Sequence, residues 1–325
     1  MDIDYLLFLQ DFRNGTQDFL TPLMEFLSDF AVNYLFLLPV FIYWVVNKRN
    51  GLYILASYYL CTGVNAAVKL TACVYRPWIR DARVLPAGDS ISSATGYSFP
   101  SGHTVAAGPF YGGLAVTAWS KAKVVSVLCG IMVLLTGFSR NYLGVHTPQD
   151  VAVAIFESVF WLIVMYVIFR YLDTHPEKEN LFLLLCLLLG VGLLVFITFK
   201  PYPMDYVDGS LLVDPQKMMN DGYGDIALIV AFPIARFIER KWIRLEPMGL
   251  NAKGVIIGLV GLVPAWAIKV LLKAPLVALL GGHWGKFARS ALLVLYCIAL
   301  FPALIKLIQR KRSITTRRKE KLAGI

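Results

Sequence analysis

The chain has 325 residues, of which 58% are hydrophobic, and its mean hydropathy is +0.63. A soluble domain of this length does not need so much apolar surface, so the composition excludes an ordinary soluble enzyme and predicts a helical membrane protein that crosses the bilayer several times. The formal net charge of +10 does not indicate a nucleic-acid partner, because many of the cations lie in short loops and in the tail, where they act as topology signals.

Apolar runs long enough to cross a hydrocarbon core of about 30 Å recur along the sequence. The first 30 residues are aromatic but are interrupted by the turn signal Asn14-Gly15, so we expect residues 1–30 to lie along the membrane interface. Nine spans are predicted after this segment, at residues 31–47, 51–74, 103–119, 123–139, 150–171, 181–199, 224–243, 254–273 and 288–308.

Charged loops predict the orientation of the nine spans. Cytoplasmic loops carry an excess of lysine and arginine, and an odd number of spans places the amino end outside and the carboxyl end inside. Residues 75–102 and 139–150 then fall on the non-cytoplasmic side. The basic segments fall on the cytoplasmic side: Lys48-Arg49, Lys121 with Lys123, Arg240 to Arg244, and Arg310 to Lys319.

Three short polar patches interrupt the apolar runs, and the first contains Lys69, Arg76 and Pro77. Charged side chains are costly at a membrane boundary and therefore suggest a function. Lys69 and Arg76 are seven residues apart, so we expect them to share one helix face, and Pro77 should end the helix at Arg76. The patch would place two cations at the mouth of a helix, with snorkelling to lipid headgroups as the alternative.

The second patch, Pro100-Ser101-Gly102-His103, opens the predicted span 103–119. A helix amino terminus offers free N–H groups and the positive end of the helix dipole, which suit a phosphate. Gly102 would let the backbone approach a ligand closely. Ser101 would either donate to a phosphate oxygen or simply cap the helix, and His103 would donate a proton to a leaving group.

The third patch contains Arg140, His146 and Asp150, between two predicted spans. Thr147-Pro148 and Asp150 fit the first positions of a helix, so capping is one explanation of Asp150. The other is that Asp150 accepts a hydrogen bond from His146 and fixes its tautomer. A histidine oriented in this way is a competent nucleophile toward phosphorus, and Arg140 would bind phosphate oxygens with two N–H groups.

Together the patches supply a nucleophile, an orienting carboxylate, an acid and several donors for a phosphoryl group. Phosphoryl transfer depends mainly on positioning and charge stabilisation, so this set is sufficient without a metal ion. The sequence predicts a membrane enzyme that removes a phosphate from its substrate through a covalent histidine intermediate.

The three patches resemble, in the same order, the signature motifs of the type 2 phosphatidic acid phosphatase (PAP2) superfamily. The matching motifs are Lys69-(six residues)-Arg76-Pro77, Pro100-Ser101-Gly102-His103, and Ser139-Arg140-(five residues)-His146-(three residues)-Asp150. The resemblance covers about residues 50–170. It implies His146 as the nucleophile that becomes phosphohistidine, Asp150 as its orienting group, and His103 as the acid that protonates the leaving alkoxide and later activates water. It also implies that no metal ion or other cofactor is needed, and that the phosphate is bound by Lys69, Arg76, Ser101, Gly102 and Arg140.

The chain carries about three more spans than the common six-span core of that family. The nine-span layout is similar to that of glucose-6-phosphatase, and sphingosine-phosphate phosphatases are also long members. We therefore expect an all-α integral membrane protein, in a bacterial cell membrane, with its active site on the extracytoplasmic side. Its expected parts are an interfacial segment (1–30), a PAP2-type catalytic core (31–199), a transmembrane extension (200–308) and a basic cytoplasmic tail (309–325).

Three functions fit these observations. The leading prediction is a phosphatase of a lipid phosphate monoester or diphosphate, with phosphatidic acid, phosphatidylglycerophosphate, a polyprenyl (di)phosphate or a sphingoid-base phosphate as candidate substrates. The second is a phosphatase of a soluble sugar phosphate, by similarity to glucose-6-phosphatase. The third is a lipid-phosphate transporter or binding protein without catalysis, and the intact His103, His146 and Asp150 argue against it because transport needs no nucleophile.

Other polar residues lie inside or at the ends of predicted spans. For Glu157 and Asn65 we favour hydrogen bonds between helices over direct support of the site. Lys269 and Lys273, with His283 just beyond them, would contact a second anionic group or snorkel to the membrane surface, and we favour snorkelling.

Overall fold

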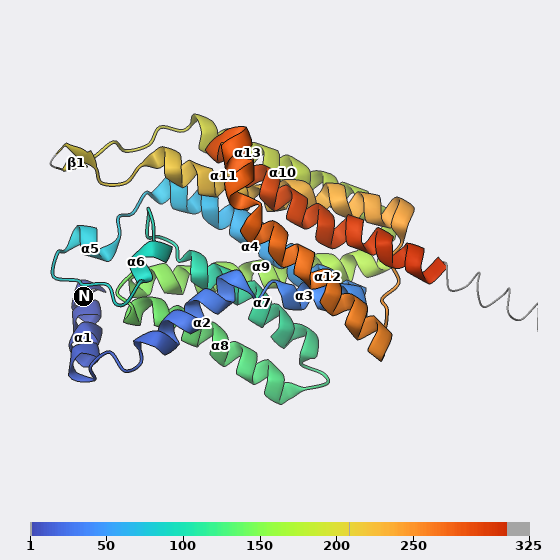
Figure 1. The fold of residues 1–325 in the computed structure, drawn as a ribbon, viewed down its shortest axis with the longest axis horizontal. Helices are drawn as coiled ribbons and strands as arrows, with labels where there is room; N and C mark the ends of the chain where they lie inside the picture. Colours follow the sequence, from blue (N-terminus) through green and yellow to red (C-terminus); the bar gives the residue numbers. More distant parts are fainter. Residues whose placement is uncertain (1, 208, 311–325) are drawn as a thin grey trace, which may run out of the picture.

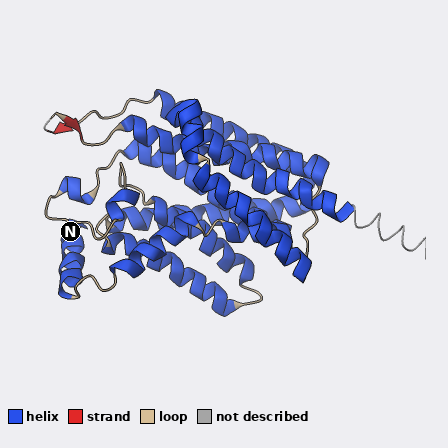
Figure 2. Ribbon diagram, viewed as in Figure 1, coloured by secondary structure: helices blue, strands red, loops and turns tan. Residues whose placement is uncertain are grey.

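The computed structural model describes residues 2–207 and 209–310, which form an elongated bundle of helices (Figure 1). The predicted fold class is confirmed: the protein is an all-α polytopic membrane protein (Figure 2). Among the described residues, the strands are β1 (Tyr206–Val207) and β2 (Ser210–Leu211), which pair antiparallel. Within the described ranges, seven helical stretches are long and apolar enough to cross a membrane: Thr21–Val46, Lys48–Arg80, Lys123–Tyr142, Pro148–Thr174, Pro176–Phe199, Ala252–Leu271 and Lys273–Arg310.

Two of the nine predicted spans do not belong to this set. They correspond to α7 (Gly102–Ala118), which has 17 residues, and to α11 (Pro215–Ile238), whose apolar run is interrupted by charged residues. Both helices nevertheless pack inside the bundle against α4 (Lys48–Ala72). The nine-span count, and the sidedness derived from it, therefore stay predictions.

The amino-terminal segment differs from the expected interfacial stretch. It forms α1 (Asp2–Gly15), α2 (Thr21–Asn33), α3 (Leu37–Phe41) and the π-helical turn η1 (Ile42–Val46). The chain reverses after Gly15, where Gln17 and Asp18 have positive φ, and the first candidate span already begins at Thr21. Only α1 lies crosswise to the bundle, at one end of it (Figure 1).

Residues 48–174 form the centre of the molecule. The helix α4 is the most buried of the candidate spans and contacts α7, α9 (Pro148–Thr174) and α11. The helix α8 (Lys123–Tyr142) packs on α7 and α2. The loop between α4 and α7 carries two short helices, α5 (Pro77–Arg80) and α6 (Ser90–Ser93). We call the end of the bundle with α1, α5, α6 and the β-hairpin the loop end (Figure 1).

After α9 come η2 (Pro176–Lys178) and α10 (Glu179–Phe199), which end the predicted core. The helices of the predicted extension are α11, η3 (Glu239–Ile243), α12 (Ala252–Leu271), α13 (Lys273–Leu295) and η4 (Tyr296–Leu300). The helix α11 connects the extension to the centre, since it packs on α13, α10 and α4. The helix α13 begins at Lys273 instead of residue 288, with a kink at Gly281 (φ 79°) that a composition-based span does not reveal. Residues 311–325 of the predicted tail lie outside the described residues.

Candidate active site

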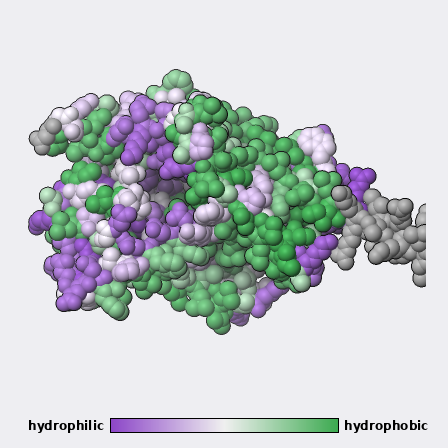
Figure 3. Space-filling view, in the orientation of Figure 1, coloured by the Kyte–Doolittle hydropathy of each residue, from purple (hydrophilic) through white to green (hydrophobic). Residues whose placement is uncertain are grey.

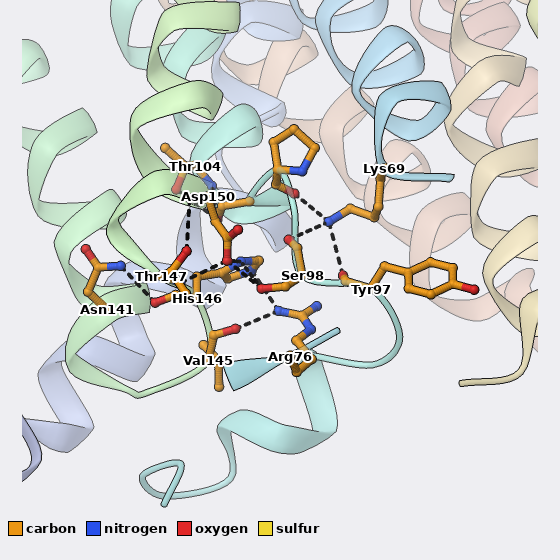
Figure 4. Close-up of polar contacts among 12 residues, drawn as sticks. Lys69, Arg76, Tyr97, Ser98, Thr104, Asn141, Val145, His146, Thr147 and Asp150 are labelled. Carbon is orange, nitrogen blue, oxygen red and sulfur yellow. Dashed lines mark hydrogen bonds and ion pairs between the residues drawn. The ribbon is translucent and has the colours of Figure 1, made fainter. Parts of the chain in front are cut away.

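The three polar patches meet at the loop end, although they are far apart in sequence. Ser101 of the second patch donates its backbone N–H to the carbonyl of Asp150 in the third (3.0 Å). Arg76 of the first patch contacts the ring of His146 in the third. Figure 4 shows how Lys69, Arg76, His146 and Asp150 converge from separate segments.

Lys69 and Arg76 do not share a helix face, so that expectation is wrong. The helix α4 ends at Ala72, because Cys73 adopts a left-handed conformation (φ 48°). Arg76 is extended (φ −65°, ψ 152°) immediately before Pro77 begins α5. The effect of proline on the preceding residue is therefore confirmed, but the helix stops earlier than the spacing argument assumed.

Lys69 anchors the loop that precedes α7. Its ammonium group donates to the carbonyls of Tyr97 (3.3 Å), Ser98 (3.0 Å) and Pro100. An ammonium group has three N–H donors, and all three are used here. The direct phosphate contact expected from the sequence would therefore require Lys69 to leave a carbonyl.

Arg76 joins two loops and the predicted nucleophile. Its Nη1 atom lies 2.9 Å from the carbonyl of Val145 and 2.8 Å from Nε2 of His146. Its Nε and Nη2 atoms donate to the carbonyls of Gly96 (3.1 Å) and Thr95 (3.3 Å). The guanidinium group is 5% exposed, so its charge is largely desolvated and directed at the imidazole.

Asp150 performs both of the roles considered for it. Its Oδ2 atom lies 3.2 Å from Nδ1 of His146 and accepts the backbone N–H of Thr147 at 2.8 Å, while the Thr147 hydroxyl accepts from the N–H of Asp150. This reciprocal pair is a capping box at the start of α9. The Ser98 hydroxyl donates to the same Oδ2 atom. The cap therefore fixes the carboxylate that orients His146.

His146 is held in one tautomer by its two partners. If Nδ1 carries the proton and donates to Asp150, Nε2 keeps a lone pair that accepts from Arg76. The ring is 1% exposed. Burial lowers the pKa of His146 well below its usual value, and the nearby charges of Arg76, Lys69 and Arg140 lower that pKa further. The imidazole is therefore neutral at pH 7, as a nucleophile must be.

Arg140 has the least satisfied side chain of the cluster. It is 1% exposed, its Nη1 atom donates to the Ser28 hydroxyl at 2.6 Å, and its Nε and Nη2 atoms have no hydrogen-bond partner. Both His103 and His146 lie within its electrostatic range. Buried donors are nearly always paired, so these two nitrogens indicate a place for an anionic ligand.

The second patch forms the open side of the site. Ser101 caps α7, since its hydroxyl oxygen accepts from the N–H and the hydroxyl of Thr104. Gly102 is exposed, and a Cβ atom there would meet no protein atom within 4 Å. The glycine therefore leaves space rather than relieving a clash. His103 is half-buried, and no described residue hydrogen-bonds to its ring, so both of its nitrogens are available to a substrate.

Three supporting residues were missed by the sequence argument. Ser98 bonds to Asp150, Ser28 to Arg140, and the Asn141 side chain donates to the carbonyl of His146 at 2.9 Å. Ser28 reaches the site from a distant segment, and nothing in its local sequence distinguishes it from neighbouring serines. Ser98 stands two residues before Pro100 and Asn141 directly follows Arg140, so both lay close enough to a motif to have been considered.

Glu157 and Asn65 lie farther along α9 and α4. The Asn65 amide donates to Oε2 of Glu157 at 2.9 Å, whereas Oε1 of Glu157 is buried without a partner. The expected hydrogen bond between helices is therefore confirmed.

Comparison with known proteins identifies a family for the central part of the chain. Residues 50–174 match the PAP2 superfamily. Phosphatidylglycerophosphatase B of Bacillus subtilis (strain 168) is 36% identical over 85 residues, which cover 24% of this chain and 41% of that protein. The alignment thus spans less than half of that relative, and no solved structure matches the chain significantly. The residues that match the PAP2 superfamily contain all three polar patches.

Proposed function

We propose that this protein is a metal-independent membrane phosphatase that removes phosphate from a lipid phosphate through a phosphohistidine intermediate, on the non-cytoplasmic face. The observation that carries the proposal is the arrangement of His146: Nδ1 faces Asp150, and Nε2 faces a guanidinium group in a buried, cationic pocket. The PAP2 domain and the partial relative named phosphatidylglycerophosphatase B support a lipid substrate.

The first chemical step forms a bond between Nε2 of His146 and phosphorus. The Nε2 lone pair attacks, the phosphorus–oxygen ester bond breaks, and the leaving oxygen takes a proton from His103, whose ring must be protonated when the substrate is bound and becomes neutral in this step. Asp150 keeps the Nδ1 proton in place and stabilises the positive charge on the ring. In the second step His103 takes a proton from water, the water oxygen attacks phosphorus, and the nitrogen–phosphorus bond breaks to release orthophosphate.

Binding of the phosphate requires an exchange of hydrogen bonds at Arg76. Its Nη1 atom now contacts Nε2 of His146 at 2.8 Å, which is the position where phosphorus must bind. A phosphate oxygen would accept this N–H and leave the Nε2 lone pair free. The unpartnered Nε and Nη2 atoms of Arg140 would bind other phosphate oxygens, and the start of α7 at Gly102 would supply backbone N–H groups.

Phosphate release by the purified protein in detergent micelles tests the proposal. We expect turnover of phosphatidylglycerophosphate or phosphatidic acid in excess chelator, and no turnover by His146→Ala. A labelled substrate quenched in alkali should leave acid-labile phosphate on the wild-type chain only, as expected for phosphohistidine. Label on a residue other than His146, or activity that disappears with chelator, would contradict the mechanism.

Two further measurements separate the alternative functions. A soluble sugar phosphate in the same assay should be a poor substrate, and preferential turnover of that compound without micelles would replace the lipid assignment. Transport of a lipid phosphate into proteoliposomes that persists in His146→Ala would favour a carrier, because a carrier does not need the imidazole nucleophile.

A further inference from the structure

A second group of charged side chains lies among the extension helices, outside the motifs of the PAP2 domain. We call it the extension cluster. All five members are half-buried, although their helices pack against one another. They are Asp221 and Asp225 of α11, Lys269 of α12, and Lys286 and Arg289 of α13.

The cluster is organised by contacts between helices. Lys286 forms an ion pair with Asp221, and Nη1 of Arg289 reaches the carbonyl of Lys269 at 3.4 Å. The helices that carry these residues lie close together, since a Cβ atom at Gly224 of α11 would lie 3.4 Å from Cβ of Lys286. The five charged groups therefore lie on neighbouring helices and influence one another electrostatically.

Lys269 does not snorkel, so the expectation favoured from the sequence is wrong. Its ammonium group turns inward, donates to the carbonyl of Val32 at the end of α2, and lies 4.4 Å from the centroid of the Phe36 ring. The reason is that the end of α2 places the carbonyl of Val32 within reach of the ammonium group. Lys273 is exposed, and snorkelling stays the prediction for that residue.

The extension cluster adjoins the candidate active site. Asp225 lies within electrostatic range of Lys69, as well as of Lys286 and Arg289. The helix α11 also packs closely on α4, since a Cβ atom at Gly63 would lie 3.3 Å from the carbonyl oxygen of Asp225. Figure 3 shows hydrophilic residues gathered around a recess near the loop end, between α13 and α2.

The charges of this region do not balance. The extension cluster contains three cations and two carboxylates, so it carries one excess positive charge. Half-buried cations without a matching number of carboxylates are costly inside a membrane protein unless an anion binds them. Two polar atoms in the adjoining turns of α11 and α13, Oδ1 of Asn220 and Nε2 of His283, are buried without a partner.

We propose that Lys269, Lys286 and Arg289 form a second anion site, which binds an anionic group on the alcohol portion of the same substrate. The two carboxylates position these cations and prevent the site from binding anions too tightly. The preferred substrates would then be phosphate monoesters whose leaving alcohol carries a second phosphate. This inference rests on the proposed function, and it gives the extension a role in selecting the substrate.

The substrate class has a lipid form and a soluble form. Phosphatidylglycerophosphate carries a terminal phosphate monoester and an internal phosphodiester, whereas phosphatidic acid carries only one phosphate. A soluble sugar bisphosphate and the matching monophosphate form the equivalent pair. Preference for the doubly charged member should appear in the lipid pair if the second anion is a headgroup, and in the soluble pair if it is a free phosphate ester.

Substitution of Arg289 tests the second site. In Arg289→Gln the ratio of kcat/KM for phosphatidylglycerophosphate to kcat/KM for phosphatidic acid should fall about ten-fold, mainly through KM, because a charge-assisted hydrogen bond is lost. Lys269→Gln should lower the ratio in the same direction, and Arg289→Lys should restore part of it. The exposed Lys273→Gln is the matched control and should leave the ratio unchanged. An equal loss for both substrates in Arg289→Gln would overturn the proposal.

A measurement of substrate binding without turnover distinguishes failure of this inference from failure of the proposed function. Wild-type protein that releases no phosphate from any of these compounds would contradict the proposed function. The affinity of His146→Ala protein for phosphatidylglycerophosphate at equilibrium still reports on the second site, because this measurement does not require turnover. Arg289→Gln in that background should weaken this binding about ten-fold relative to that of phosphatidic acid, and equal binding would contradict the second site.

Discussion

The two charged regions of this protein are built in different ways. In the candidate active site, Lys69 and Arg76 donate mainly to backbone carbonyls, and Asp150 accepts the backbone N–H of Thr147 in the cap of its own helix. In the extension cluster, Lys286 pairs with the carboxylate of Asp221, while Lys269 and Arg289 each donate to one backbone carbonyl. Several backbone contacts fix each cation of the first region, whereas each cation of the second has fewer contacts with described residues. Chemistry needs the first kind of site, and selection among ligands can use the second.

The largest expected effect comes from replacing the carboxylate at the centre of the candidate active site. Asp150→Asn should keep the fold, because an amide oxygen can still accept from Thr147, but it no longer favours the reactive tautomer of His146. We expect kcat to fall about 10³- to 10⁴-fold, measured by phosphate release from micelles. Ser98→Ala removes another partner of the same oxygen atom and is the milder companion variant. Wild-type turnover by folded Asp150→Asn would show that the contact is only a cap.

A substitution at the contact between α4 and α11 can disturb the packing of the candidate active site against the extension cluster. Gly63 of α4 faces α11, and a Cβ atom there would lie 2.4 Å from the Ile229 side chain. Gly63→Val should therefore force the helices apart and lower the free energy of unfolding by about 1–3 kcal/mol, measured by denaturation in detergent. Gly130→Val is the control, because a Cβ atom at Gly130 meets nothing within 4 Å. Equal stability of the two variants would mean that α11 does not depend on close contact with α4.

The pH dependence of activity should respond to the charge that surrounds His146. The pKa of this imidazole is well below its usual value, so the neutral nucleophile should persist below pH 6.5. The fall of kcat/KM on the acid side should therefore occur below that pH. Lys69→Gln removes one of the cations that lower this pKa, so the acid limb should move to higher pH by up to about one unit. The substrate ionises in the same way in assays of the wild type and of Lys69→Gln, so it does not cause a difference between their pH profiles. A limb that stays in place, or moves to lower pH, would contradict this electrostatic role.

The smallest expected effect concerns the open side of the site. No protein atom lies within 4 Å of a Cβ atom at Gly102, so Gly102→Ala should leave thermal stability nearly unchanged. The methyl group would stand where we expect the phosphate to approach α7, and KM should rise a few-fold. A variant with lower stability and unchanged KM would show that the glycine serves the fold instead.

Local rules predicted the parts of this protein that depend on neighbouring residues. Apolar runs gave the helices, and the Thr147, Pro148 and Asp150 pattern gave the cap of α9. The family resemblance covered about residues 50–170, close to the 50–174 of the matched domain. Roles of individual site residues stay predictions until they are measured.

Contacts between distant segments could not be predicted in this way. The bond between Ser28 and Arg140 joins residues 112 positions apart, and the inward turn of Lys269 depends on the distant carbonyl of Val32. The contacts of Lys69 could not be predicted either, because its partners are carbonyl oxygens of a loop, and every residue has the same backbone oxygen. Side-chain identity therefore revealed which groups are unusual, but not which backbone atoms they hold.

The contact between Arg76 and Nε2 of His146 has a consequence for the resting protein. An exposed, neutral imidazole would react with alkylating or acylating compounds in its surroundings, whereas the Nε2 lone pair of His146 is engaged by Arg76 and the ring is 1% exposed. A phosphate-like anion that draws Arg76 aside would itself cover this nitrogen. Diethyl pyrocarbonate should therefore modify the half-buried His103 before His146, and vanadate, as a phosphate mimic, should protect His146 further.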